Sequence, residues 1–153
     1  MGYIGGGFFK SKMKASIDAL TIIMGFEAFK EKPYRCPGGV LTIGYGTTNG
    51  VTKDMKVTHQ QAVDLMKKDI SKIEYFLNSE ILIPLKQNQF DALISFVYNI
   101  GISQFKTSTI LKLLNKGNIG LASQEFTKWS FIKKVWWRGL YRRRLAEKAL
   151  FDL

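Results

Sequence analysis

The sequence predicts an α+β fold that is mostly helical, with a small β lobe near the N-terminus. After residue 58, apolar residues recur every three or four positions along most of the chain, which is the spacing of amphipathic helices. The segment from Tyr34 to Val51 is instead rich in β-branched and aromatic residues. Gly38-Gly39 and Asn49-Gly50 interrupt it, as in a β-hairpin or a three-stranded meander. A chain of 153 residues, 46% of them hydrophobic, is long enough for one domain.

Changes in composition divide this single domain, residues 1–153, into four parts. Residues 1–10 are glycine-rich and are expected to form a flexible leader. Residues 11–57 are expected to hold the first helix and the β lobe. Residues 58–82 should form a long helix that links this lobe to a larger helical lobe, residues 83–153. The C-terminal region of that lobe is basic and rich in tryptophan.

The first helix is expected to begin at Ser11, which can cap it, and to end near Ala28 or Phe29. Its apolar positions are Met13, Ile17, Leu20 and Met24. The linking helix should begin at Thr58, because Gln61 three residues later completes a capping box. Its apolar stripe consists of Val63, Met66, Ile70, Ile73 and Leu77. His59 lies off this stripe, which predicts an exposed histidine without a role.

The helical lobe should open with a helix from Leu85 to about Ile100, which Gly101 ends. Short helices are expected from Thr107 or Ser108 to Lys116 and from Asn118 to about Lys128. Residues 129–139 are predicted to form a loop, so that no sheet is expected outside the N-terminal lobe. The last helix should cover Leu140 to Leu153. Its expected packed residues are Leu145, Ala146, Ala149 and Leu150, and its expected exposed residues are Arg142, Arg143, Arg144 and Lys148.

The formal net charge of +11 favours a polyanionic partner, and nucleic acid, an anionic membrane and the bacterial cell wall all qualify. A single cysteine excludes an internal disulfide and any multi-cysteine metal site, and no metal or other cofactor is expected. The N-terminus is too polar for a signal sequence, and no apolar run reaches the roughly 18 residues that span a bilayer. We therefore expect a soluble protein made in the cytoplasm.

Glu27 is the candidate general acid. It follows the apolar run Leu20–Phe26, so one side of its carboxyl group should be desolvated, which raises the pKa of a carboxyl group. A glutamic acid that keeps its proton near neutral pH suits general acid catalysis. Glu31 and Asp54 are alternative carboxylates, but both lie in polar surroundings.

Glu27, Cys36 and Thr42, followed by Gly44-Tyr45-Gly46, form a spaced set that resembles the Glu–Asp/Cys–Thr signature of phage-type lysozymes, the endolysins of glycoside hydrolase family 24. The segment from Gln89 to Gly101 and the segment from Gly139 to Glu147 are also similar to this family, in the same order. The resemblance extends from about Ile17 to Phe151. It implies a lysozyme-like fold and a muramidase that cuts the β-1,4 bond between N-acetylmuramic acid and N-acetylglucosamine in peptidoglycan, causing lysis of the host cell.

The resemblance also implies roles for individual residues. Glu27 would be the acid, and Cys36 would take the position that is Asp in many relatives, as a base, a nucleophile or a positioning residue. Thr42 would position the attacking water. Asn99, with Tyr98 beside it, would contact sugar. An arginine would approach the acid from Arg138, Arg142 or Arg143, and Arg142 is our candidate for a substrate-binding residue.

Other functions would also explain the positive charge. A cationic membrane-disrupting protein is the alternative, because tryptophans and basic residues alternate in the C-terminal region. The expected contacts with an anionic outer membrane or other envelope surface are Trp136, Trp137, Arg138, Arg143 and Arg144, although these tryptophans could instead pack in the core. A nucleic-acid binder is disfavoured, since no base-stacking sheet or helix-turn-helix pattern is found. We expect a monomer that leaves the host cytoplasm for the periplasm or cell wall after a separate protein permeabilises the inner membrane.

Overall fold

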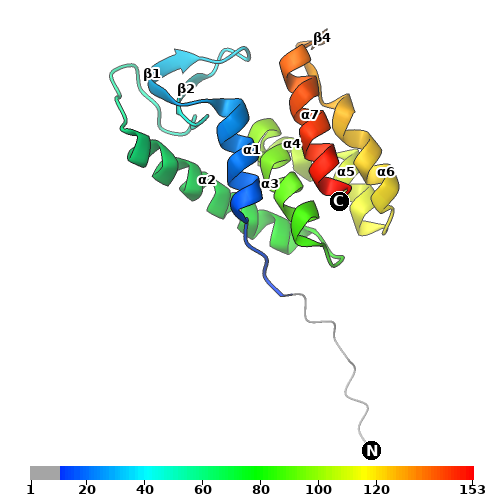
Figure 1. Cartoon of the computed structure of the whole chain (residues 1–153). Coiled ribbons are helices and arrows are strands. Elements are labelled where there is room, and N and C mark those ends of the chain that lie inside the picture. Colours follow the sequence, from blue (N-terminus) through cyan, green and yellow to red (C-terminus); the bar gives the residue numbers. More distant parts are fainter. Residues whose placement is uncertain (1–10) are drawn as a thin grey trace, which may run out of the picture.

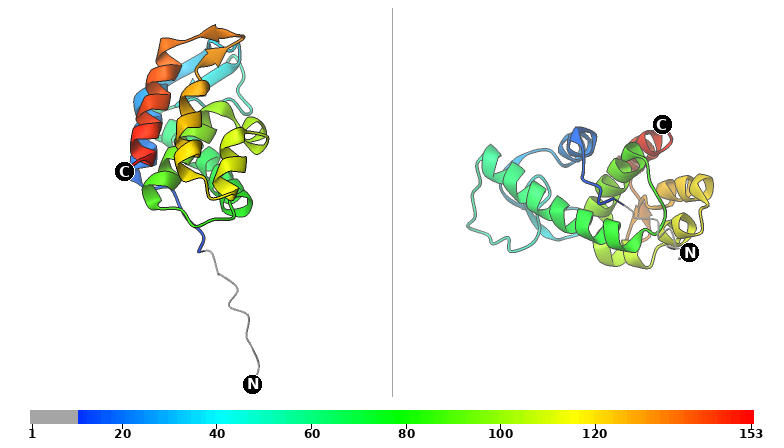
Figure 2. Two further views of the ribbon diagram at one scale, coloured as in Figure 1. Left: turned by 90° about the vertical axis from the view of Figure 1, so that its right-hand side faces the viewer. Right: turned by 90° about the horizontal axis from the view of Figure 1, so that it is seen from below.

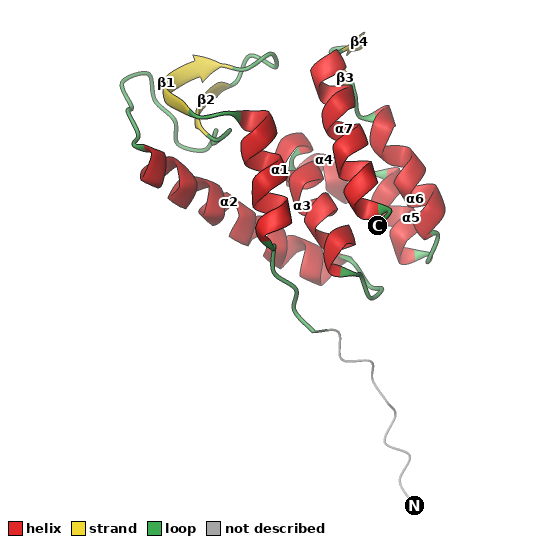
Figure 3. Ribbon diagram, in the orientation of Figure 1, coloured by secondary structure: helices red, strands yellow, loops and turns green. Residues whose placement is uncertain are grey.

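The computed structural model describes residues 11–153, so the leader predicted for residues 1–10 lies outside the described residues. The described part is mostly helical and holds two small antiparallel hairpins, which confirms the predicted fold class (Figures 1 and 3). The elements in chain order are α1 (Ile17–Glu27), β1 (Lys30–Arg35), β2 (Leu41–Gly44), α2 (His59–Glu80), α3 (Gln87–Ile100), α4 (Ile102–Lys106), α5 (Thr109–Asn115), α6 (Ile119–Glu125), the 3-10 helix η1 (Phe126–Lys128), β3 (Phe131–Ile132), β4 (Val135–Trp136) and α7 (Arg138–Phe151).

Helix α1 begins later than predicted, because Ser16 and not Ser11 caps it. The Ser16 hydroxyl accepts from the Asp18 backbone N–H at 3.3 Å. The helix ends at Glu27, since Ala28 adopts a positive φ of 50° and turns the chain into β1. Strand β1 pairs with β2 in an antiparallel hairpin whose register places Tyr34 opposite Thr42. The first strand therefore starts at Lys30, four residues before the predicted β segment.

Helix α2 connects the β1–β2 hairpin to the helical half of the molecule, as its length predicts (Figure 2, right). The predicted capping box is confirmed, because the Thr58 hydroxyl accepts from the Gln61 N–H and the Gln61 side chain accepts from the Thr58 N–H. Most of the predicted stripe is buried, and Val63 is half-buried. No helix among residues 11–153 combines the length and the apolar character needed to cross a bilayer.

Helix α3 forms the centre of the helical half, with α1, α2 and α7 packed around it (Figure 1). Its residues from Phe90 to Val97 are all buried, and Gly101 ends it with a φ of 92°, as predicted. Phe96 makes edge contacts with Phe105, Phe126 and Trp129, which join α3 to α4, η1 and the chain before β3. Helix α4 was not predicted, because its five residues are too few to show a periodic pattern.

Two predictions for the C-terminal region are wrong. Residues 129–139 are not a loop, since β3 and β4 pair there in a second hairpin. Helix α7 begins at Arg138, and its buried side includes Arg143, Arg144 and Glu147, whereas Leu145 is 42% exposed. Charged residues at helical spacing normally face water. Here they are buried because they pair with one another.

Candidate active site

Glu27 lies at the C-terminal end of α1, where the chain turns into the β1–β2 hairpin. Its side chain is mostly buried but retains 17% exposure. Its Oε1 accepts a hydrogen bond from Arg143 Nη1 at 2.6 Å. Its Oε2 lies against the backbone of Gly46, where a Cβ atom would be only 2.6 Å from this oxygen. Gly46 has a φ of 86°, so glycine is required here by conformation as well as by space.

Arg143 is the arginine that approaches the candidate acid, which the sequence left open. Its Nε donates to Glu147 Oε1 at 3.0 Å, and its Nη2 donates to the Ser95 carbonyl at 3.1 Å. The guanidinium also lies 5.8 Å from the ring centre of Phe26. Since an arginine has a planar set of donors, these contacts fix the direction in which Nη1 points. Arg138 and Arg142 are exposed on α7.

Arg144 and Glu147 complete a buried charge cluster behind Arg143. Arg144 Nη2 donates to Glu147 Oε1 at 2.8 Å, and its guanidinium lies 4.9 Å from the ring centre of Phe96. Burial raises the pKa of Glu147 and lowers the pKa of Arg144, while their mutual attraction opposes both shifts. The prediction that Arg143 and Arg144 contact the envelope is therefore wrong, because both side chains are inside the protein.

Cys36 and Thr42 belong to the β1–β2 hairpin. The Cys36 backbone N–H donates to the Val40 carbonyl at 3.0 Å and closes the turn that contains Gly38-Gly39. The Cys36 thiol is half-buried. Thr42 is buried, and its hydroxyl donates to the same Val40 carbonyl at 2.9 Å. The oxygen of this hydroxyl can therefore still accept a hydrogen bond from another group.

Tyr34 links Cys36 electrostatically to Glu27, and it was not among the site residues predicted from the sequence. Burial raises the pKa of the Tyr34 hydroxyl, and the negative charges of Glu27 and Cys36 raise it further. Tyr34 thus lies within electrostatic reach of both groups. It stands opposite Thr42 in the hairpin and two residues before Cys36, which are the spacings of side chains on one face of a sheet. The two-residue spacing from Cys36 was the signal that could have identified it.

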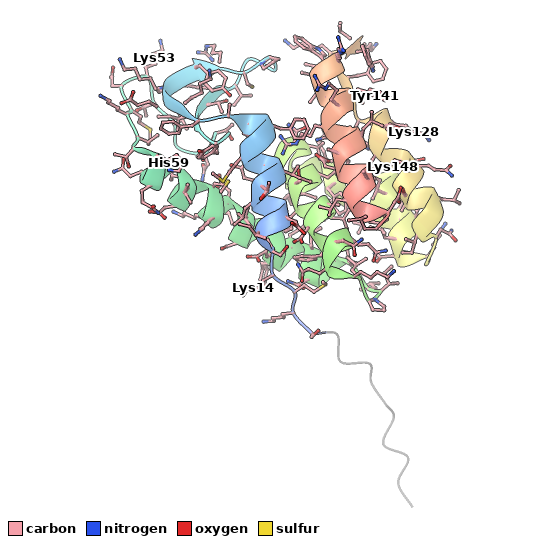
Figure 4. The ribbon with its side chains drawn as sticks, in the orientation of Figure 1. Lys14, Lys53, His59, Lys128, Tyr141 and Lys148 are labelled. Atoms are coloured by element: carbon pink, nitrogen blue, oxygen red, sulfur yellow. The ribbon has the colours of Figure 1, made fainter. Side chains whose placement is uncertain are left out.

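Tyr98 and Asn99 have different surroundings at the end of α3. The Tyr98 hydroxyl donates to the Tyr45 carbonyl at 2.5 Å, and burial raises its pKa above the ordinary value. Tyr98 therefore holds the loop that presses Gly46 against Glu27. The Tyr45 hydroxyl is 2.7 Å from His59 Nε2, so His59 is exposed as predicted but is not without a contact (Figure 4). Asn99 is exposed, and its predicted sugar contact stays a prediction.

Among residues 11–153, no three His, Cys, Asp or Glu side chains gather as metal ligands. Glu31 forms an exposed ion pair with Lys56 at 3.2 Å, and Asp54 is exposed. Neither alternative carboxylate is surrounded by buried partners as Glu27 is. The arrangement around Glu27 offers one partly exposed carboxyl group, an arginine that can stabilise its anion, and the phenol of Tyr34 within electrostatic reach.

Known proteins are similar to this chain in sequence and fold. Residues 24–147 match the protein family described as Phage lysozyme, and this range includes Glu27, Cys36 and Arg143. An endolysin of Acyrthosiphon pisum secondary endosymbiont phage 1 is 43% identical over 144 residues, which cover 92% of this chain and 99% of the relative.

Two solved structures are also similar. The endolysin from Escherichia coli O157:H7 phage FAHEc1 has a TM-score of 0.82 and 34% identity over 94% of this chain and 96% of that chain. The muramidase domain of SpmX from Asticaccaulis excentricus has a TM-score of 0.83 and 35% identity over 92% of this chain and 98% of that chain. Since the family match extends from the end of α1 into α7 and its relatives are covered almost completely, this chain belongs to the phage lysozyme family.

Proposed function

We propose that this endolysin cleaves the β-1,4 bond between N-acetylmuramic acid and N-acetylglucosamine in peptidoglycan, with Glu27 as the general acid. As a phage lysozyme, the chain is a peptidoglycan-hydrolysing enzyme. The observation that carries the residue assignment is the pairing of Glu27 Oε1 with Arg143, which leaves Oε2 as the oxygen that can hold a transferable proton.

Hydrolysis requires the acid to protonate the glycosidic oxygen as its bond to the anomeric carbon breaks. Protonated Glu27 would give its proton from Oε2 while Oε1 still accepts from Arg143. The transfer leaves a carboxylate, and the guanidinium beside it stabilises that new negative charge. Arg143 is already fixed by Glu147 and Ser95, so little reorganisation is needed when the charge appears.

Water must then add to the anomeric carbon and lose a proton. Cys36 is our candidate for the second group, and it would act as the base, as a nucleophile that water later displaces, or as a positioning residue. Thr42 offers only an acceptor to the attacking water, because its own proton is donated to Val40. A hydroxyl that accepts a hydrogen bond from the water orients the water oxygen. It does not act as the base that takes the proton from the water.

The test is the release of reducing sugar from purified, lipid-free peptidoglycan by Glu27→Gln. We expect the rate to fall by about 10²- to 10⁴-fold, the loss typical of removing a general acid. Glu31→Gln is the matched control, because it makes the same chemical change at an exposed carboxylate and should keep the wild-type rate. A folded Glu27→Gln protein that retains more than a tenth of the wild-type rate would contradict the assignment.

We further infer that the enzyme acts as a monomer. In the host it is expected to accumulate in the cytoplasm until a separate protein permeabilises the inner membrane. Fractionation of host cells before and after that permeabilisation tests this route. Endolysin activity in the periplasmic fraction before permeabilisation would overturn it.

A further inference from the structure

The β3–β4 hairpin carries an unusual group of exposed aromatic and basic side chains. The exposed fractions of its large apolar residues range from 40% for Trp137 to 59% for Val135. Large apolar side chains gathered on a surface mark binding sites more often than isolated ones do. We define the hairpin surface as the exposed side chains of Phe131, Lys133, Lys134, Val135, Trp136, Trp137 and Arg138.

The base of the hairpin is firmly attached to the helical half. Trp129, just before β3, packs edge-on against Phe96 with ring centres 5.8 Å apart, as expected for a core tryptophan. The Trp137 backbone N–H donates to the Ser130 carbonyl at 2.9 Å. The ring centres of Trp136 and Tyr141 are 5.7 Å apart. Tyr141 lies in the upper part of α7 (Figure 4). The hairpin surface is therefore a fixed platform, and binding to it would cost little ordering entropy.

Two lysines form the tip in a strained conformation. Lys133 and Lys134 join β3 to β4 as a two-residue turn, with φ values of 48° and 67°. Such turns favour glycine or asparagine, because other side chains are strained at positive φ. The chain thus keeps two positive charges at the tip at a cost in conformational energy. No Asp or Glu occurs between Glu125 and Glu147, so the hairpin surface has no carboxylate of its own.

The hairpin surface lies at the same end of the molecule as the candidate acid. In two views at right angles, the β3–β4 hairpin, the β1–β2 hairpin and the N-terminal end of α7 share this end (Figures 1 and 2). Trp137 precedes Arg143, the partner of Glu27, by six residues, which is roughly 9 Å along a helix axis. The hairpin surface therefore begins within two helical turns of the residue that pairs with Glu27.

We propose that the hairpin surface binds a stretch of the same peptidoglycan strand beyond the cleaved bond. This inference rests on the proposed function. The indoles of Trp136 and Trp137 would stack on the apolar faces of sugar rings, and Lys133, Lys134 and Arg138 would pair with carboxylates of the stem peptides. An anionic bilayer would satisfy the same charges. However, it would hold the end of the molecule that carries Glu27 against lipid instead of glycan.

The binding test uses the full chain with Glu27→Gln as background, so that no substrate is consumed, and lipid-free peptidoglycan sacculi as the probe. Trp136→Ala with Trp137→Ala should weaken binding about tenfold or more, as removal of exposed aromatic anchors typically does. Trp136→Phe with Trp137→Phe should retain most of the binding. Tyr75→Ala, which removes an aromatic ring that is 77% exposed on α2, is the matched control and should bind normally.

The charge test replaces Lys133 and Lys134 with Gln and compares them with Lys112→Gln and Lys116→Gln, two exposed lysines of the α5 region. Only the hairpin pair should lower sacculus binding and reduce its dependence on salt. Circular dichroism spectra must match those of the background protein. If both pairs of substitutions weaken sacculus binding equally, the hairpin lysines contribute only through the overall charge of the protein. That result would overturn their assignment as specific contacts.

The catalytic arm restores Glu27 and measures kcat/KM on intact glycan strands and on short soluble muropeptides. The tryptophan double variant should lower the ratio of polymer to fragment activity about tenfold, whereas Tyr75→Ala should leave the ratio unchanged. If wild type releases no reducing sugar, the proposed function fails, while the binding arm still tests the hairpin. Normal sacculus binding with loss of binding to phosphatidylglycerol vesicles would overturn the proposal in favour of a lipid surface.

Discussion

A single guanidinium connects the candidate acid to the interior of the helical half. Arg143 donates to Glu27, to Glu147 and to the Ser95 carbonyl, so three elements determine its position. A lysine could not reproduce this geometry, since it lacks the planar set of donors. The position of the guanidinium beside Glu27 therefore depends on Ser95 of α3 and Glu147 of α7.

At the same scale, two substitutions test whether the Cys36 thiol takes part in catalysis. Cys36→Ser keeps the size of the side chain but cannot ionise, and we expect it to lose about 10²-fold or more in kcat/KM, the range seen when a catalytic base is removed. Cys36→Asp supplies a carboxylate and should stay within about tenfold of wild type. Clearing of purified cell walls measures both. Equal, near-wild-type rates would show that the thiol only fills space in the hairpin.

The sequence proposes Glu27, Cys36 and Thr42 as site residues because motif spacing is local information, and their roles stay predictions. It did not identify Tyr34, and it could not select Arg143 among three arginines, because that choice depends on the rotation of α7. Charged residues at helical spacing normally indicate a solvent-facing side. The exception arises here because Glu147 of the same helix is buried with Arg143 and Arg144 and pairs with both. Arg143 also pairs with Glu27 of α1, a contact between elements that the spacing within α7 cannot reveal.

At the scale of elements, the β3–β4 turn keeps two lysines at positive φ, where glycine or asparagine would be less strained. Lys133→Asn with Lys134→Gly should raise the free energy of unfolding by about 1–2 kcal/mol, because these residues tolerate positive φ in a two-residue turn. Urea denaturation measures the change. Lys133→Gln with Lys134→Gln removes the same charges but keeps the strain, so it should show no such gain. A gain of the same size in both pairs would assign the effect to charge repulsion.

The β3–β4 hairpin could not be predicted from sequence patterns. Its strands contain two residues each, which is too short for an alternating pattern, and its turn lacks the glycine or asparagine that normally marks one. By contrast, α2 has a capping box and a stripe of several turns, and its predicted start agrees with the structure. Long elements whose ends carry a specific capping or turn motif were predicted well, and short elements without such motifs were not.

At the scale of the whole molecule, the chain before α1 is fastened to the helical half by Asp91. This buried carboxylate of α3 accepts from the Ser16 N–H at 2.8 Å, from the Ser16 hydroxyl, and from the Gln87 side chain at 3.0 Å. Met13 and Asn78 of α2 also exchange hydrogen bonds at 2.8 Å. The start of α1 is thus tied to both long helices, at a distance from the residues around Glu27.

Asp91→Ala should therefore lower the free energy of unfolding by about 2–3 kcal/mol, since it leaves buried donors without a charged acceptor. Thermal unfolding followed by circular dichroism should show a midpoint lower by roughly 5–10 °C. Asp64→Ala, at an exposed position of α2, should change stability by less than about 0.5 kcal/mol. The specific activity of folded Asp91→Ala should equal wild type. A matching loss of activity would mean that Asp91 also supports the active site.

Gly46 has a consequence for how such sequences can diverge. A Cβ atom at position 46 would lie only 2.6 Å from Glu27 Oε2, so a side chain there would force the Glu27 carboxyl group to move. Substitutions at positions 27 and 46 are therefore coupled. Loss of the carboxyl group to a small residue removes the overlap, but a side chain at position 46 is still strained by the positive φ. A relative with a side chain at position 46 is therefore expected to have moved or lost the carboxyl group at position 27, a coupling that sequence comparison can detect.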